Sequence, residues 1–181
     1  MINLDRTSSN NLMLDIETLG VNFNSAVIQI AMIRFDFNRN IYSHFVGNLE
    51  YKSQLSKGLI TEEKTINWWK EQNTEILKDI LSESSDTLEV LNTLDKYIQP
   101  NDTIWSSGNF DVPILANLYK AFGKEVPWRY YNALDIRVLT KLANINIRTD
   151  YNYMKEKTHN ALDDCKFQIN YCCDAIDILE K

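Results

Sequence analysis

The period of the apolar positions changes along the chain and separates strand-like from helix-like segments. Residues 11–16 (NLMLDI) form a short, largely apolar run that predicts a buried strand. Residues 26–35 (AVIQIAMIRF) and 40–46 (NIYSHFV) predict two more strands, and the polar residues 38–40 between them predict a hairpin turn. A fourth short strand is predicted at 103–106 (TIWS).

Elsewhere the apolar residues recur every three or four positions, which predicts helices with one buried face. Predicted helices cover 65–81, 86–98 and 111–122. Asp135 is predicted to cap a further helix that runs through Leu142. The C-terminal segment, from Leu162 to Leu179, carries a clean apolar stripe on one helical face.

Three strands, helices, a strand and more helices predict an α/β fold with a mixed sheet covered by helices. The 181 residues, 44% of them hydrophobic, fit one soluble domain over 1–181. No apolar stretch approaches the ~18 residues of a membrane helix, and residues 1–11 lack the basic start and apolar run that are expected of a signal peptide. We therefore expect a cytoplasmic protein of a bacterium or a phage-infected cell, with no membrane partner. Its three cysteines share one predicted helix, and we interpret them as buried apolar residues: Cys165, Cys172 and Cys173.

The charge balance does not by itself favour a nucleic-acid partner. The formal net charge is −6 and the sequence pI is about 5.0, whereas nucleic-acid-binding domains usually present a basic face. If the substrate is nucleic acid, the positive charge must be local or must come from bound metal ions.

The segment Leu14-Asp15-Ile16-Glu17 places two acids at the end of a predicted buried strand. Residues two apart in a strand point to the same face, so the carboxylates of Asp15 and Glu17 should lie side by side. Two such acids repel, and a hard divalent cation such as Mg²⁺ or Mn²⁺ relieves the conflict. An ordinary surface pair is the alternative interpretation.

Two later segments carry further candidate residues. Asp111 follows the predicted strand 103–106, and taken alone it is best interpreted as a helix N-cap. His159 stands just before the last predicted helix, whose Asp163 or Asp164 could simply satisfy the helix dipole. The only other histidine, His44, lies in a predicted strand without an acidic neighbour, and we interpret it as structural.

Taken together, LDIETLG, GNFDVPIL and HNALDD resemble, in this order, the three motifs of the DnaQ-like (DEDDh) 3′–5′ exonucleases. The spacing of five between His and Asp in the third motif selects Asp164 over Asp163. The segment Thr65-Ile66-Asn67-Trp68-Trp69-Lys70-Glu71-Gln72 is similar to the subgroup of the phage exonuclease DexA and small 3′–5′ exoribonucleases. The resemblance spans residues 14–164.

The resemblance implies a ribonuclease-H-like fold, a mixed five-stranded sheet with helices on both faces. It also implies hydrolysis of terminal phosphodiesters of DNA or RNA at a 3′ end, with release of nucleoside 5′-monophosphates. Two divalent cations, Mg²⁺ or Mn²⁺, would be the cofactors. By carry-over Asp15 bridges both ions, Glu17 and Asp164 complete the first site, and Asp111 supports the second. His159 is the general base, a role that suits an imidazole at neutral pH.

Contacts with the substrate are implied less directly. By resemblance, the backbone at Thr18 and Leu19 meets the terminal nucleotide, with Leu19 wedged beside a base. An aromatic ring could stack on a base. On a helix adjacent residues point about 100° apart, so one of Trp68 and Trp69 is expected in the core and the other on the substrate groove, with Trp68 taken as the candidate. The alternative is that both tryptophans are structural. The other candidates are Phe110, Asn109 and Gln72.

Other functions stay open at this point. An oligoribonuclease-like enzyme for very short RNA would share the motifs, and so would a non-catalytic nucleic-acid-binding module. A structural protein with these acids as caps and surface charge would discard the resemblance altogether. Many relatives are dimers, which leaves a homodimer open for this chain.

Overall fold

The computed structural model describes residues 5–72, 74–151 and 159–181. Five strands form one sheet in the order β3-β2-β1-β4-β5. The pairs β1/β2 and β2/β3 are antiparallel, and the pairs β1/β4 and β4/β5 are parallel. The sheet is therefore mixed and five-stranded, as the resemblance implies. Its strands are β1 Asn11–Thr18, β2 Val27–Phe35, β3 Ile41–Asn48, β4 Thr103–Ser106 and β5 Ala133–Asp135.

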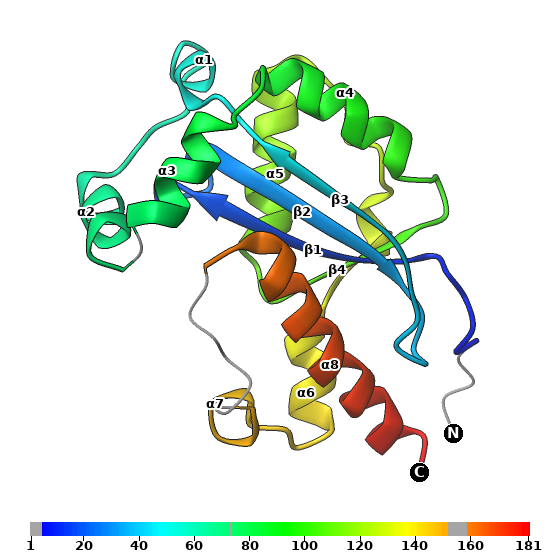
Figure 1. Cartoon of the computed structure of the whole chain (residues 1–181). Coiled ribbons are helices and arrows are strands. Elements are labelled where there is room, and N and C mark those ends of the chain that lie inside the picture. Colours follow the sequence, from blue (N-terminus) through cyan, green and yellow to red (C-terminus); the bar gives the residue numbers. More distant parts are fainter. Residues whose placement is uncertain (1–4, 73, 152–158) are drawn as a thin grey trace.

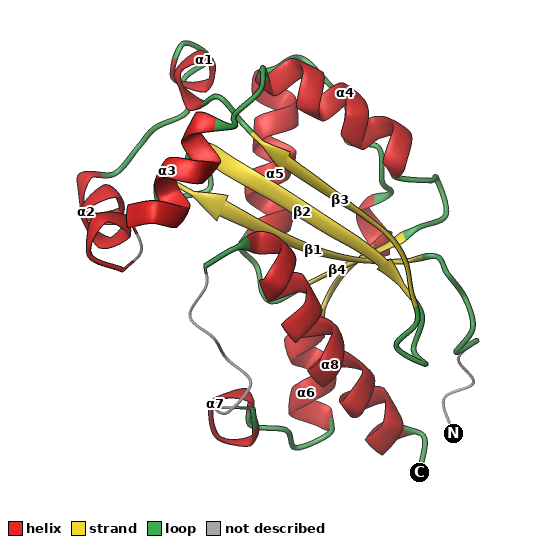
Figure 2. Cartoon of the chain, in the orientation of Figure 1, coloured by secondary structure: helices red, strands yellow, loops and turns green. Residues whose placement is uncertain are grey.

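The helices lie against both faces of the sheet (Figure 1), and Figure 2 shows the strands enclosed between them. Helices α4 and α5 cover one face, and α8 lies across β1 and β2 on the other with α6 packed beside it. Within the described residues, none is long and apolar enough to cross a bilayer. Their bounds are α1 Tyr51–Leu55, α2 Glu63–Gln72, α3 Thr74–Ser82, α4 Thr87–Tyr97, α5 Asp111–Ala121, α6 Ile136–Leu142, α7 Ile147–Asp150 and α8 Ala161–Leu179, with a 3₁₀ turn at Tyr130–Asn132.

Alternation along β1 sorts its side chains between two cores. Leu12, Leu14 and Ile16 join the core under α4 and α5, whereas Met13 joins the core under α6 and α8. Asp15 and Glu17 have the same parity as Met13, so they belong to the face that α8 covers. This register brings two acids of a buried strand to the N-terminal end of a helix.

Most predicted elements are confirmed, with two differences. The predicted helix 65–81 is two helices, α2 and α3, and Asn73 between them lies outside the described residues. Short elements α1, α7 and β5 were not predicted, because segments of three to five residues are too short to display a period. The prediction of a cap for α6 is confirmed, since the Asp135 carboxylate accepts from the N–H of Arg137 at 2.9 Å.

Candidate active site

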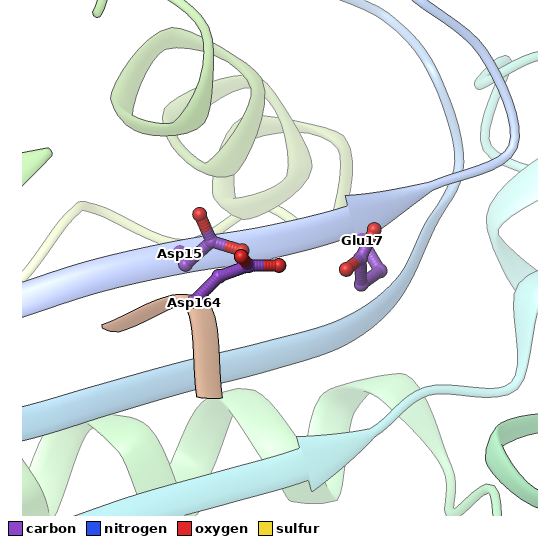
Figure 3. Close-up of side chains that lie close together, drawn as sticks. All are labelled: Asp15, Glu17 and Asp164. Carbon is purple, nitrogen blue, oxygen red and sulfur yellow. The ribbon is translucent and has the colours of Figure 1, made fainter. Parts of the chain in front are cut away.

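Three carboxylates meet where the end of β1 faces the first turn of α8. Asp15, Glu17 and Asp164 each offer an oxygen, and these oxygens lie within 4.8 Å of one another. Figure 3 shows the carboxylates of Asp15 and Asp164 turned towards each other, with Glu17 further along β1. The structure therefore brings together acids 147 to 149 residues apart in sequence, as the motif order predicts.

Asp111 reaches the same region from the first turn of α5. The residue is 4% exposed, and its Oδ1 accepts from the N–H of Ile16 at 3.4 Å. It does not cap its own helix, because the N-cap position is Phe110, which makes no side-chain cap bond. The interpretation of Asp111 as an N-cap is therefore wrong, and its carboxylate is tied to β1 between the two acids of that strand.

His159, two residues before α8, lines the same cavity as Asp15, Asp111 and Asp164. Its φ of 44° is left-handed, a conformation that few side chains adopt outside tight junctions. The next residue, Asn160, caps α8 through the N–H of Leu162 at 3.1 Å. The imidazole meets the ring of Trp68 edge to face, with 4.6 Å between centroids. This sharp junction sets the imidazole beside the helix that carries Asp164.

Of the two adjacent acids on α8, the structure brings only Asp164 into the cluster. Asp163 is exposed and pairs with Lys166, with 2.8 Å between carboxylate and amine. His44 is exposed on β3, which is separated from β1 by β2 in the sheet. The cysteines Cys165, Cys172 and Cys173 are all buried, which confirms their interpretation as core residues.

Burial and mutual repulsion raise the pKa values of the clustered acids. Burial, and then Asp111, Glu17 and Asp164, hold the pKa of Asp15 well above its usual range, while a hydrogen bond from Gln168 lowers it. Burial, followed by the charges of Asp164 and Asp111, raises the pKa of Glu17 to about 8. Burial likewise raises the pKa of Asp111 to about 7, against hydrogen bonds to backbone N–H groups and the charge of Arg137.

This donor set fits a hard divalent cation. Carboxylate oxygens are the ligands that Mg²⁺ and Mn²⁺ prefer, and three of them converge within 4.8 Å. Burial and then the charges of neighbouring acids raise the pKa values of Glu17 and Asp15, so their ionised forms are unfavourable without a counter-charge. A bound cation would supply that charge, so the residues present fit a site for divalent metal.

Two adjoining cavities flank the acids and share three wall residues, Ile16, Glu17 and Phe110. The acidic cavity has a volume of about 410 Å³ and also contains Asp15, Asp111, His159 and Asp164. The apolar cavity has a volume of about 380 Å³. Its other walls are Thr18, Gly20, Val21, Glu62, Lys64, Thr65, Trp68 and Trp69.

The two adjacent tryptophans differ in burial, as their helical spacing predicts. Trp69 is 1% exposed and its indole N–H donates to the carbonyl of Thr18 at 3.0 Å, so it fixes the end of β1 to α2. Trp68 is 38% exposed and lines the apolar cavity next to His159. Both indoles line the apolar cavity, but Trp69 is buried, so Trp68 is the exposed ring of the pair.

Two predicted substrate contacts are poorly placed. The side chain of Leu19 packs in the core with Trp69, its N–H donates to Ala26, and its carbonyl accepts from Glu62. Its side chain is therefore not available as a wedge beside a base, and its N–H is already paired. Asn109 is exposed and is absent from the walls of both cavities.

The sequence reasoning missed two groups that the structure adds to the site. Gln168 lines the acidic cavity and donates to Asp15, and its position four residues after Asp164 on one helix face is a signal that could have identified it. Arg137 is a local cation whose charge acts on Asp111 and whose guanidinium lies against Gly108. Only the fold brings Arg137 there.

Comparison with known proteins assigns the chain to a family. The model of the 3′–5′ exoribonuclease Rv2179c-like domain matches residues 10–176. The chain belongs to this family. An exodeoxyribonuclease of Enterobacteria phage T4 is 30% identical over 159 residues, an alignment that covers 69% of this chain and 68% of the phage protein. This Rv2179c-like chain is thus an exonuclease of the superfamily that its three motifs resemble.

Solved structures share the fold of the Rv2179c-like chain. Pop2p of S. pombe, in a form with Mg²⁺ and Mn²⁺ bound, superposes with a TM-score of 0.65 at 14% identity, over 92% of this chain and 82% of Pop2p. E. coli exonuclease I, in complex with an oligonucleotide, superposes with a TM-score of 0.60 at 14% identity, over 88% of this chain. The chain spans only 38% of the length of exonuclease I. These likenesses confirm the ribonuclease-H-like fold.

Proposed function

We propose that this exonuclease removes nucleoside 5′-monophosphates one at a time from the 3′ end of single-stranded RNA. The observation that carries the proposal is the convergence of Asp15, Glu17 and Asp164 within 4.8 Å beside His159 and an apolar cavity. Acids that hold cations, a base, and a pocket for a flat ring are the groups that terminal phosphodiester hydrolysis needs.

The acids would hold two divalent cations, Mg²⁺ or Mn²⁺. Asp15 would contact both ions, Glu17 and Asp164 would complete one site, and Asp111 would support the second. When bound, the cations supply an activated water and neutralise charge at the scissile phosphate. They also place positive charge in a chain of net charge −6, which removes the need for a basic face.

His159 would act as the general base. Its imidazole lines the acidic cavity together with Asp15 and Asp164, and the edge-to-face contact with Trp68 limits its rotation. A neutral imidazole nitrogen can accept a proton from an attacking water near neutral pH and release it to solvent.

The apolar cavity would bind the terminal nucleotide. Trp68 and Phe110 present aromatic surface along its wall, and stacking on such rings is worth about 1–3 kcal/mol per base with little dependence on sequence. Lys64 on the same wall offers a cation to a phosphate. Because the two cavities share Glu17 and Phe110, a nucleotide in the apolar cavity would present its phosphate to the acids.

RNA is our first choice of substrate because the family description names exoribonuclease activity. The phage T4 relative is named an exodeoxyribonuclease, so DNA is the alternative substrate and is tested beside RNA. The homodimer and the cytoplasmic location stay predictions.

A gel time course on 5′-labelled RNA and DNA of one sequence, with Mn²⁺, Mg²⁺ or EDTA, tests the proposal. We expect a ladder that shortens from the 3′ end of RNA, only with metal, and nucleoside 5′-monophosphates as products. A ladder on DNA alone would overturn the choice of sugar. Internal cuts, or intact strands of both kinds with folded protein and metal, would overturn the reaction.

A further inference from the structure

Gln168 is a buried polar side chain on α8, close in sequence to Asp164. The proposed chemistry gives it no role. It lies one helical turn after Asp164, is 5% exposed and lines the acidic cavity. Its Nε2 donates to Oδ1 of Asp15 at 2.6 Å. This is a short hydrogen bond to the acid that would bridge both cations, made from the helix that carries another ligand.

The position of Gln168 relative to β1 is fixed by its surroundings. Cys165, one turn earlier, donates its thiol to the carbonyls of Met13 and Ala31 at 3.4 and 3.6 Å. At the start of α8 the N–H of Ala161 donates to Gln29, at 2.9 Å. These contacts hold the helix against β1 and β2, so the amide of Gln168 has little freedom to follow a moving carboxylate.

The amide has the chemistry that this position requires. An N–H donor satisfies one oxygen of Asp15 without adding charge, whereas a carboxylate at this position would add a further acid to the cluster. An apolar side chain of equal length would leave that buried oxygen without this donor, which is unfavourable for a buried acceptor. The Oε1 atom of Gln168 is buried and has no partner among the described residues, so the amide is not retained for a second protein contact.

We propose that Gln168 is a positioning residue for Asp15, which fixes one carboxylate oxygen so that the other stays turned towards Glu17 and Asp164. The inference rests on the proposed function, because it gives the Asp15 carboxylate a cation to bind. Partners that orient a metal ligand in this way typically change metal affinity by about 10–100-fold when they are removed.

Gln168→Met tests the proposal, because it keeps the length and volume of the side chain and removes the donor. Mn²⁺ affinity is measured by titration calorimetry on the metal-free protein, together with its thermal midpoint. We expect the dissociation constant for Mn²⁺ to rise about 10–100-fold. At saturating Mn²⁺, kcat should recover to within a few-fold of wild type, and KM for RNA should not change.

Gln54→Met is the matched control. Gln54 is fully buried on α1 and bonds to both backbone groups of Val27, away from the acids. Its replacement should lower the thermal midpoint and leave the dissociation constant for Mn²⁺ unchanged. A loss of affinity that merely follows a loss of stability would therefore appear in both variants and overturn the proposal.

Wild-type Mn²⁺ affinity in Gln168→Met would also overturn the positioning role. If that variant does not fold, Gln168→Asn provides the measurement, since its amide is shorter by one methylene and cannot reach Asp15 from the same backbone. Asp164→Asn distinguishes a failure of the proposed metal site from a failure of the role of Gln168. If Asp164→Asn binds Mn²⁺ as well as wild type, the proposed metal site is wrong. If Asp164→Asn loses Mn²⁺ affinity and Gln168→Met does not, only the role of Gln168 is overturned.

Discussion

At the scale of the residue, the site is an assembly of acids that the fold holds in an unfavourable arrangement. Asp15 and Glu17 lie on one face of β1, Asp164 approaches from α8, and Asp111 is bonded to the β1 backbone between them. Burial and repulsion raise the pKa values of Asp15, Glu17 and Asp111. Side chains in such a cluster are expected to destabilise the metal-free protein and to bind cations.

Asp15→Asn should therefore separate folding from metal binding. The substitution removes a buried charge and the repulsion around it, so the metal-free thermal midpoint should stay the same or rise. Stabilisation by Mn²⁺ should disappear, because a ligand that binds the native state raises its apparent stability only if it binds. Thermal scans with and without Mn²⁺ measure both. A wild-type shift with Mn²⁺ would contradict the assignment of Asp15 as a ligand.

His159→Asn should reduce kcat about 10²–10⁴-fold, the usual contribution of a general base. Asparagine suits this test because it tolerates the left-handed backbone, here at φ 44°, better than alanine does. The shift of the thermal midpoint with Mn²⁺ should remain, since His159 is not in the set of converging ligands. Single-turnover rates on RNA give the measurement, and a loss of less than about fivefold would exclude His159 as the base.

At the scale of the element, α2 has two adjacent tryptophans with different roles: Trp69 packs in the core, and Trp68 is partly exposed beside the cavity. Trp69→Ala should destabilise the protein by about 3–5 kcal/mol, because it leaves a large cavity and removes the hydrogen bond to Thr18. Trp68→Ala should cost less than about 1 kcal/mol, since the side chain is 38% exposed. Denaturant unfolding at fixed pH compares the two.

Substitution of Trp68 is also expected to change the kinetics. Trp68→Ala should raise KM for RNA with a smaller change in kcat, because the ring lines the cavity proposed for the terminal base. Unchanged KM and kcat in a folded Trp68→Ala protein would remove Trp68 from the substrate site.

The sequence predicts long periodic elements well and predicts junctions poorly. Strand β2 and helix α8 follow from apolar patterns of ten or more residues and β1 from the shorter run 11–16, and Asp15, Glu17 and Asp164 follow from motif spacing on β1 and α8. The local pattern around Asp111 predicts a cap, because an acid after a strand and before a helix is usually one, and the structure shows a bond to β1 instead. Leu19, Gln168 and Arg137 depend on tertiary packing, which no local pattern encodes.

At the scale of the whole molecule, the acidic cluster links stability to pH. Glu17 and Asp111 titrate near pH 8 and 7 in the folded chain, against ordinary values of 4.5 and 3.8. Between these limits the folded state binds more protons than the unfolded state, so the stability of the metal-free protein should fall as pH rises. Carboxyls with lowered pKa values, such as Asp36 and Asp177, act below about pH 4.5 and oppose this trend only there.

Thermal scans of metal-free protein from pH 5 to 8 measure this dependence. We expect the midpoint to decline across the range in EDTA and to decline less with Mn²⁺, which stabilises the ionised acids. Asp15→Asn should flatten the decline in EDTA because it removes charge from the cluster. A midpoint that rises with pH in EDTA would contradict the repulsion between these acids.

The most direct test of the account compares wild type, Asp164→Asn and Asp163→Asn on one 5′-labelled RNA strand with Mn²⁺. The two acids are neighbours on α8, but only Asp164 belongs to the converging set, whereas Asp163 is exposed and pairs with Lys166. We predict a ladder from the 3′ end for wild type and Asp163→Asn, and an intact strand for folded Asp164→Asn. A ladder from Asp164→Asn at the wild-type rate would contradict the metal site and the mechanism built on it.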